Sequence, residues 1–361
     1  MVRLGDICKF QSGGTPSKGE PSYFNGNIPW ITTVALNGSI IDESCAVDWI
    51  TEKAIENSAA KVVPANSVMV GTRVGVGKVA INKVPMSTSQ DIISLLDIDE
   101  SKWSKEFICK FILGQATYLN SQARGATIKG IKIETLAGLQ LPDIPLDQQC
   151  KIAVSIDAVN NLIALRKEQL AKLDQLVKSR FIELFGDYRI NEKGFDCKKG
   201  SELFKFSSGK FLPEEKRLDE GIPVYGGNGI AWYTSESLVD YPTIIIGRVG
   251  AQCGNIHAVT TPVWITDNAI YIKEQKTNAY TLEFLTELMR MMDFYQYADF
   301  SGQPKITQKP LETLNYIMPP IELQNEYTAF VEQTDKSKVS IQQSNDKLEM
   351  LKKSQMQEYF G

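Results

Sequence analysis

Two long stretches of the chain repeat apolar residues at helical spacing. Between Asp147 and Phe185 the chain has no proline or glycine, and an apolar seam alternates intervals of four and three residues. This alternation is the heptad rule of coiled coils. Two of the ten seam positions are arginine; the seam is Ile152, Ile156, Val159, Ile163, Arg166, Leu170, Leu173, Val177, Arg180 and Leu184.

A second stretch, Glu322 to Phe360, also lacks proline and glycine, but its seam has polar gaps. Its apolar positions are Tyr327, Phe330, Val331, Ile341, Leu348, Leu351 and Tyr359. Each stretch follows a pair of prolines, which is a start signal for a helix. A helix of roughly 38 residues is about 57 Å long and needs a partner for its apolar seam. The two helices are therefore expected to pair antiparallel, with a globular domain at each end. The alternative is that each packs separately on its own domain.

The segments in front of these helices differ from them in pattern. They contain short β-rich runs between glycine and proline turns, such as "VPANSVMVG" and "YPTIIIG", and one amphipathic helical piece each. This mixture predicts α+β domains. The expected organisation is a domain over residues 1–142, a helix over 143–186, a domain over 187–319 and a helix over 320–361.

The chain is an internal repeat. "KFQSGGTPSK" matches "KFSSGKFLPE", "NIPWI" matches "GIPVY", and "KSRFIELFG" matches "KSQMQEYFG", which ends at Gly361. Arg73-Val74-Gly75 matches Arg248-Val249-Gly250, and Ser89-Gln90-Asp91 matches Thr266-Asp267-Asn268. Collinear matches at several places predict two similar units related by a pseudo-twofold axis.

The stretch "VGTRVGVGKV" resembles a phosphate-binding loop, but its spacing does not fit one. Five residues separate Gly71 from Gly77, where a Walker loop has four, and Val79 stands where that loop has a hydroxyl. The following "KVAINKVP" is β-rich rather than helical. The stretch is therefore expected to be a tight turn between two strands.

Composition narrows the class of protein. The net charge is −4, with 14 basic and 13 acidic residues over 1–140 and 13 and 16 over 191–318. No basic stripe exists, so any DNA contact must come from local loops. The six cysteines form no C-x-x-C pair and there is one histidine, which argues against a zinc site. No apolar run is long enough to span a membrane and no signal peptide is evident, so the expected location is the cytoplasm.

The repeated order of domain, "IPLDQQ"-type helix start and long helix ending in "FG" resembles the specificity subunit of type I restriction-modification systems. The second helix start, "PIELQN", departs from the Q-Q form. The resemblance implies two target recognition domains that each read half of a bipartite DNA site. Because the two domains differ in sequence, that site should be asymmetric. The long helices would act as spacer and as docking site for two methyltransferase subunits, which restriction and translocase subunits join.

The resemblance also implies that the chain is not catalytic. It lacks the [DN]-P-P-[YFW] motif of amino-methyltransferases. No cofactor is expected in this chain, whereas S-adenosylmethionine, ATP and Mg²⁺ are expected on the partner subunits. Two other classes stay open, which are a coiled-coil scaffold without DNA recognition and a self-sufficient enzyme.

Candidate DNA contacts come from polar residues in the repeated loops. Arg and Lys suit guanine or phosphate, and Asn or Gln suits adenine. Trp30, Val74 and Val249 are expected in the core instead. The candidates are Thr15, Ser17, Lys18, Arg73, Lys78, Arg124, Lys129, Lys132, Tyr225, Asn228, Trp232, Arg248, Gln252, Gln303, Lys305 and Lys309.

Overall fold

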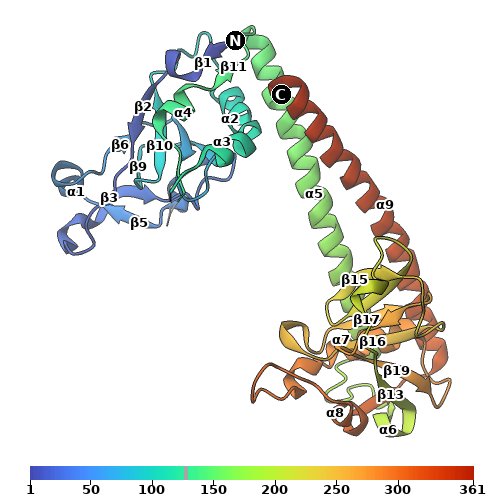
Figure 1. Ribbon diagram of the computed structural model, residues 1–361. Coiled ribbons are helices and arrows are strands. Elements are labelled where there is room, and N and C mark those ends of the chain that lie inside the picture. Colours follow the sequence, from blue (N-terminus) through green and yellow to red (C-terminus); the bar gives the residue numbers. More distant parts are fainter. Residues whose placement is uncertain (126–128) are drawn as a thin grey trace. The chain divides into compact units, whose positions relative to one another are not determined.

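The computed structural model describes residues 1–125 and 129–361 (Figure 1). It divides into two compact units. The first unit consists of residues 1–166 and 344–361, and the second consists of residues 167–343. Both chain ends therefore belong to the first unit.

The first unit is built on two sheets. The larger has the strand order β2 (Lys9–Ser12), β10 (Ile92–Leu96), β7 (Val68–Gly71), β8 (Val79–Asn82) and β4 (Ile40–Ile41). The smaller has the order β5 (Asp48–Ile50), β3 (Phe24–Ile31), β9 (Met86–Thr88) and β6 (Val62–Val63). The short strands β1 (Val2–Arg3) and β11 (Gln140–Leu141) pair with each other. The helices are α1 (Glu52–Asn57), α2 (Lys105–Gly114), α3 (Ala116–Gln122) and α4 (Ile133–Ala137).

The second unit repeats this plan with fewer strands. Its larger sheet has the order β13 (Phe204–Ser208), β19 (Ala269–Gln275), β16 (Thr243–Gly247) and β17 (Ile256–Val259). A smaller sheet joins β15 (Gly229–Thr234), β14 (Ile222–Gly226) and β18 (Trp264–Ile265), and β12 (Asp196–Lys199) pairs with β20 (Asn315–Met318). The helices are α6 (Gly200–Leu203), α7 (Leu282–Met291) and α8 (Gln308–Thr313). The predicted α+β class and the predicted repeat are both confirmed.

The two long helices are α5 (Leu146–Phe185) and α9 (Ile321–Phe360). In the second unit Arg180 of α5 forms an ion pair with Glu326, and Asp174 forms one with Lys338 at 2.8 Å. Residue numbers fall along α5 as they rise along α9, so the helices pair antiparallel, as predicted. In the first unit Gln355 donates a hydrogen bond to Ser155 at 2.9 Å.

Burial along α9 corrects its predicted seam. Leu351 is exposed, whereas Thr334 and Asn345 are buried. An unbroken alternation of four and three can be followed through positions that are buried or half-buried, with polar side chains in the places that looked like gaps. These positions are Tyr327, Val331, Thr334, Lys338, Ile341, Asn345, Leu348, Lys352, Gln355 and Tyr359. The second seam is therefore complete but half polar, which the apolar pattern alone did not reveal.

The helix starts share one hydrogen-bonded glutamine. Gln149 accepts from the Ser104 N–H at 3.0 Å and donates to two carbonyl oxygens, those of Lys102 and Ile144. In the second unit Gln324 accepts from the Thr281 N–H at 2.9 Å and donates to the carbonyl oxygens of Ala279 and Pro319. Both glutamines are buried. The apparent departure in "PIELQN" thus affects only the exposed position of Gln148.

The two "FG" endings anchor the helices in the same way. Phe185, at the end of α5, packs on Phe284 of α7 with ring centroids 4.6 Å apart. Phe360, at the end of α9, packs on Phe107 of α2 at 5.4 Å. Phe107 and Phe284 each lie three residues after the capping residue of their helix. Each unit therefore buries the end of one long helix beside the start of the other.

Candidate nucleic-acid interface

The glycine stretch forms a tight turn between antiparallel strands in both units. The Gly71 N–H donates to Lys78 and the Gly77 N–H donates back to Gly71. Gly247 and Gly254 make the corresponding bonds, to Asn255 and Gly247. The strand β8 follows the first turn, so the prediction of a turn rather than a nucleotide loop is confirmed.

Backbone hydrogen bonds beside this turn shift the predicted alignment of the two units by one residue. The Thr72 N–H donates to Asp91 at 2.8 Å, and its carbonyl accepts from Ile131. In the second unit the Arg248 N–H donates to the Asn268 carbonyl at 2.9 Å, and the Arg248 carbonyl accepts from the Ile306 N–H. Arg248 therefore stands in the place of Thr72, and Val249 in the place of Arg73. The alignment matched the two Arg-Val-Gly strings because it had no information on strand pairing.

Two backbone hydrogen bonds in each unit also fix how the loops that contain Lys129 and Lys305 align with each other. Arg124 and Gly130 exchange two backbone hydrogen bonds at 2.9 and 3.0 Å, and Asp299 and Lys305 exchange two at 2.8 and 3.1 Å. The spacing is the same in both, so Lys129 corresponds to Pro304 and Lys132 to Thr307. Gln303 corresponds to residue 128, which lies outside the described residues. The two loops match as predicted, but their lysines do not occupy matching places.

One hollow recurs in both units, beside the first and third strands of the larger sheet. In the first unit it has a volume of about 340 Å³ and Arg73, Lys132 and Glu134 line it together with Ser12 and Thr72. In the second it has a volume of about 380 Å³ and its lining includes Ser208, Arg248, Thr307, Gln308, Lys309 and Glu312. We call this the strand-edge hollow. It brings together candidates from different loops, Arg73 with Lys132 in the first unit and Arg248 with Lys309 in the second.

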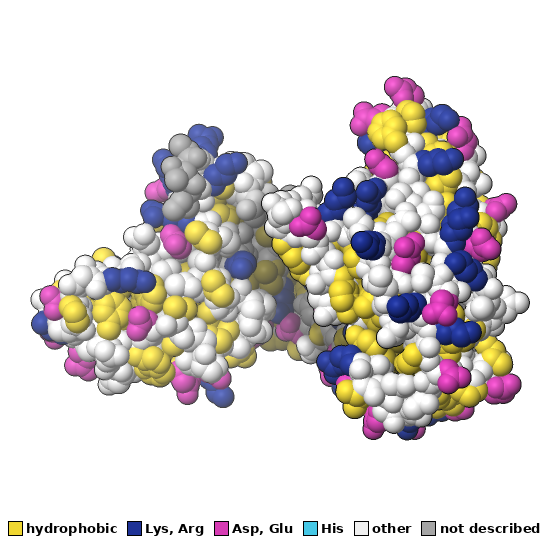
Figure 2. All heavy atoms as spheres, turned by 90° about the horizontal axis from the view of Figure 1, so that it is seen from below, with side chains coloured by type: hydrophobic (Ala, Val, Ile, Leu, Met, Phe, Trp, Pro, Cys, Tyr) yellow, Lys and Arg dark blue, Asp and Glu magenta, His cyan; other side chains and the backbone are white. Residues whose placement is uncertain are grey.

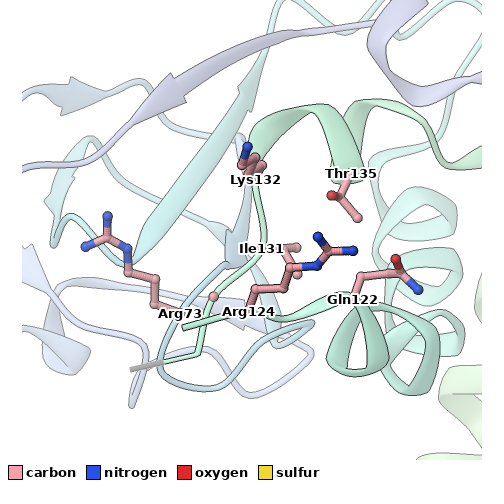
Figure 3. Close-up of a pocket in the computed structure, with 7 residues that line it drawn as sticks. Arg73, Gln122, Arg124, Ile131, Lys132 and Thr135 are labelled. Atoms are coloured by element: carbon pink, nitrogen blue, oxygen red, sulfur yellow. The ribbon is translucent and has the colours of Figure 1, made fainter. Parts of the chain in front are cut away.

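A further hollow of about 460 Å³ opens in the first unit next to Arg73. Its described lining residues combine three cations with a glutamine and a threonine, and none of them is a carboxylate. Figure 3 shows the guanidinium of Arg124 extending toward Gln122 and Thr135, with Arg73 on the other side. We call this the cationic hollow; its lining residues are Arg73, Gln122, Arg124, Gly130, Ile131, Lys132 and Thr135. Gln122 was not among the sequence candidates because nothing in its local pattern sets it apart.

Several of the remaining candidates are not among the lining residues of either hollow. Thr15, Ser17, Lys18, Lys78 and Lys129 are exposed. Gln252 accepts a hydrogen bond from Asn255 at 2.6 Å and is half-buried, which suits a bracing role in the turn.

A separate aromatic group lies in the second unit around β14 and β15. The Arg217 guanidinium lies 4.1 Å from the ring centroid of Trp232, a cation–π contact. Tyr225 lies 6.0 Å from the ring of His257. Asn228, in the tight turn between the strands, is exposed. Tyr225, Asn228 and Trp232 were sequence candidates and Arg217 was not, because its contact with Trp232 joins residues that are not neighbours in the chain.

The three residues that were expected in the core differ in burial. Trp30 is buried and donates through Nε1 to the Gly14 carbonyl at 3.0 Å. Val74 is 54% exposed, so that prediction is wrong, and Val249 is half-buried. Val74 follows Arg73 at the tip of a turn, where no strand or helix covers it.

Surface charge is mixed on both units. Figure 2 shows Lys and Arg side chains interspersed with Asp and Glu over the face in view. Among the described residues, no helix is long and apolar enough to span a membrane. Nor do residues 1–125 and 129–361 bring together three or more side chains that could hold a metal ion.

A family profile described as the type I restriction modification DNA specificity domain matches residues 1–175 and 192–350. The chain belongs to this family. The specificity chain thus carries two copies of the domain, and its resemblance to the DNA sequence-specificity subunits of type I systems is confirmed.

Two curated relatives are similar to this chain in sequence. It is 24% identical over 356 residues to the type I restriction enzyme EcoprrI specificity subunit of Escherichia coli, covering 92% of this chain and 86% of the relative. It is 27% identical over 240 residues to the MjaIX specificity subunit of Methanocaldococcus jannaschii, covering 62% of this chain and 56% of the relative.

Solved structures share the fold. The S subunit of a type I restriction-modification system from M. genitalium has a TM-score of 0.66 and 18% identity, covering 100% of this chain and 95% of that one. A chain from a study of complex assembly and conformational transition in the type I system has a TM-score of 0.64 and 16% identity, covering 99% and 96%.

Proposed function

We propose that the specificity chain reads an asymmetric, bipartite site on double-stranded DNA, with one unit on each half-site. The observation that carries this proposal is the pair of matched loops. Both units hold them with the same backbone hydrogen bonds, yet present different side chains from them. A shared frame with different side chains is what two readers of different half-sites need.

The long helices serve as spacer and as docking surface for two methyltransferase subunits. Support comes from apolar side chains that lie outside the seam and stay exposed on the two helices. On α5 these are Val154, Leu162, Leu165, Leu176 and Ile182, and on α9 they are Val339, Met350 and Leu351. Exposed apolar groups repeated along a helix favour contact with another protein. Restriction and translocase subunits complete the assembly.

In this proposal the specificity chain supplies recognition and no chemistry. S-adenosylmethionine, ATP and Mg²⁺ bind to the partner subunits and take part in the reactions there. The mixed surface charge fits this division, because partner subunits that enclose the DNA would add phosphate contacts.

Methylome sequencing of a strain that expresses the whole system tests the proposal. It should reveal one asymmetric bipartite motif, and a duplex carrying that motif should bind the purified complex more tightly than a scrambled duplex. Equal binding to both duplexes would favour a coiled-coil scaffold. Methylation by the isolated chain with S-adenosylmethionine would instead indicate a self-sufficient enzyme.

Arg73 offers a test at the level of one unit. Arg73→Ala should weaken binding to the half-site of the first unit and leave the other half-site unaffected. The side chain is half exposed and lies 3.9 Å from Asp91, so its removal should not disturb the fold. Unchanged binding would remove Arg73 from the contact residues.

A further inference from the structure

The cationic hollow has the charge of an anion-binding site, and none of its described lining residues is a carboxylate. Arg73, Arg124 and Lys132 line it, and Figure 3 shows the guanidinium of Arg124 extending toward Gln122 and Thr135 while that of Arg73 points to the opposite side. Within the described part of the chain, Arg124 and Lys132 form neither an ion pair nor a side-chain hydrogen bond. Arg73 is 3.9 Å from Asp91, a distance at which its donors remain open to a second partner.

Gly130 shapes the hollow by having no side chain. A Cβ at this position would lie 2.8 Å from Cγ of Arg73 and 3.0 Å from the carbonyl oxygen of Thr72. The arginine stem therefore packs directly over the glycine backbone. In the second unit the same pair of places holds Val249 and Lys305, which form a β-bridge.

The second unit has no cation in the three matching places. The backbone bonds put Val249 in the place of Arg73, Asp299 in the place of Arg124, and Thr307 in the place of Lys132. Hydrogen bonds from Ser301 hold the pKa of Asp299 below its usual range, so it is a carboxylate at neutral pH. Tyr297 replaces Gln122, two residues before the paired position, and an exposed aromatic pair, Tyr295 and Phe300, lies nearby with ring centroids 5.3 Å apart.

We propose that the cationic hollow binds an acceptor-only group of the DNA target, and that the second unit has no counterpart of this site. The acceptor is either the O6 and N7 edge of a guanine or the oxygens of a backbone phosphate. Both present acceptors without donors, which matches three cations and suits a forked guanidinium. This inference rests on the proposed function, since it names what one unit recognises.

The test uses the full complex with its methyltransferase subunits and the duplex identified by methylome sequencing. Arg124→Ala should weaken binding about tenfold or more. Guanine replacements in each half-site, together with the salt dependence of binding, separate the two acceptors. If guanine is the acceptor, the loss disappears on duplexes that lack one guanine in the first half-site. If phosphate is the acceptor, the loss is uniform over sequences and the salt slope falls by about one.

Arg124→Lys distinguishes the acceptors independently. Lysine keeps the charge but loses the fork, so it should retain most binding to a phosphate and little discrimination of a guanine. Lys9→Ala removes one exposed charge from the same unit and serves as the matched control. Thermal unfolding of each variant confirms that the fold is intact.

Two failures can be told apart. If the wild-type complex does not distinguish its duplex from a scrambled one, the proposed function fails. If it does, but Arg124→Ala binds as the wild type does or loses affinity for the second half-site, the assignment of the cationic hollow is overturned.

Discussion

Lys110 of α2 forms an ion pair with Asp157 of α5 in the first unit, while its own side chain is only 6% exposed. It also donates to the Gly38 carbonyl at 3.3 Å. The matching position in the second unit, six residues after the helix cap, holds the buried Glu287, which pairs with Arg290 at 3.4 Å. One place in the repeat therefore carries opposite charges in the two units.

Asp157→Ala should destabilise the first unit by about 2–4 kcal/mol, because it leaves a buried ammonium with one carbonyl partner. Lys110→Met should cost less, about 1–2 kcal/mol, since Asp157 is 46% exposed and can be hydrated. Chemical denaturation of both variants measures the difference. Lys102→Met, which breaks an exposed pair, is the control and should change little. A larger cost for Lys110→Met than for Asp157→Ala would contradict this explanation.

Gln324→Leu should destabilise the second unit by about 2–4 kcal/mol, since it strands one buried N–H and removes donors to two carbonyls. Gln148→Leu is the matched control. That side chain is exposed, and Leu323 already fills the corresponding place in the second copy. Thermal unfolding should separate the two variants clearly; equal losses would show that the glutamine bonds add nothing specific.

Gly254→Ala should destabilise the turn of the second unit by more than about 2 kcal/mol. Gly254 has φ of +85°, and a Cβ there would lie 2.5 Å from the backbone nitrogen of Tyr295. Gly194→Ala isolates the backbone effect, since Gly194 has φ of +69° but no atom within 4 Å. The Gly194→Ala control should lower the free energy of unfolding by about 1 kcal/mol. The two unfolding midpoints should differ, and a smaller effect at Gly254 would show that the turn can shift away from the clash.

His257 should make stability depend on pH. Burial lowers the pKa of His257, and this outweighs the opposing effect of the contact between Nε2 and the Gly227 carbonyl at 3.4 Å, which favours the protonated ring. The unfolded chain therefore binds the proton more readily, so stability is full above about pH 6.5 and falls as the pH drops through the folded pKa. Because the chain has a single histidine, His257→Gln removes the only imidazole. Unfolding midpoints from pH 7.5 to 5 should fall more for the wild type than for the variant, and parallel curves would refute the assignment.

Local pattern was enough to predict the long helices, the repeat and the turn at Gly75. The helices and the turn depend on residues close together in the chain, namely a run without proline or glycine, a four-three apolar seam and a glycine-rich turn, and the repeat is a likeness between two strings of letters. The seam of α5 behaves as predicted, and its ten positions are all buried or half-buried.

Other features depend on which segments meet in space. Thr334 and Asn345 lie buried in the seam of α9, although neither residue is apolar. Arg248 stands in the place of Thr72 because strand pairing and the bond from Ile306 set the register, and not the likeness of two Arg-Val-Gly strings. The cationic hollow exists because the bond from the Ile131 N–H to the Thr72 carbonyl brings the loop that Arg124 and Gly130 close beside Arg73. The sequence by itself determined the elements and their repetition, whereas contacts between distant segments decided which side chains each unit presents.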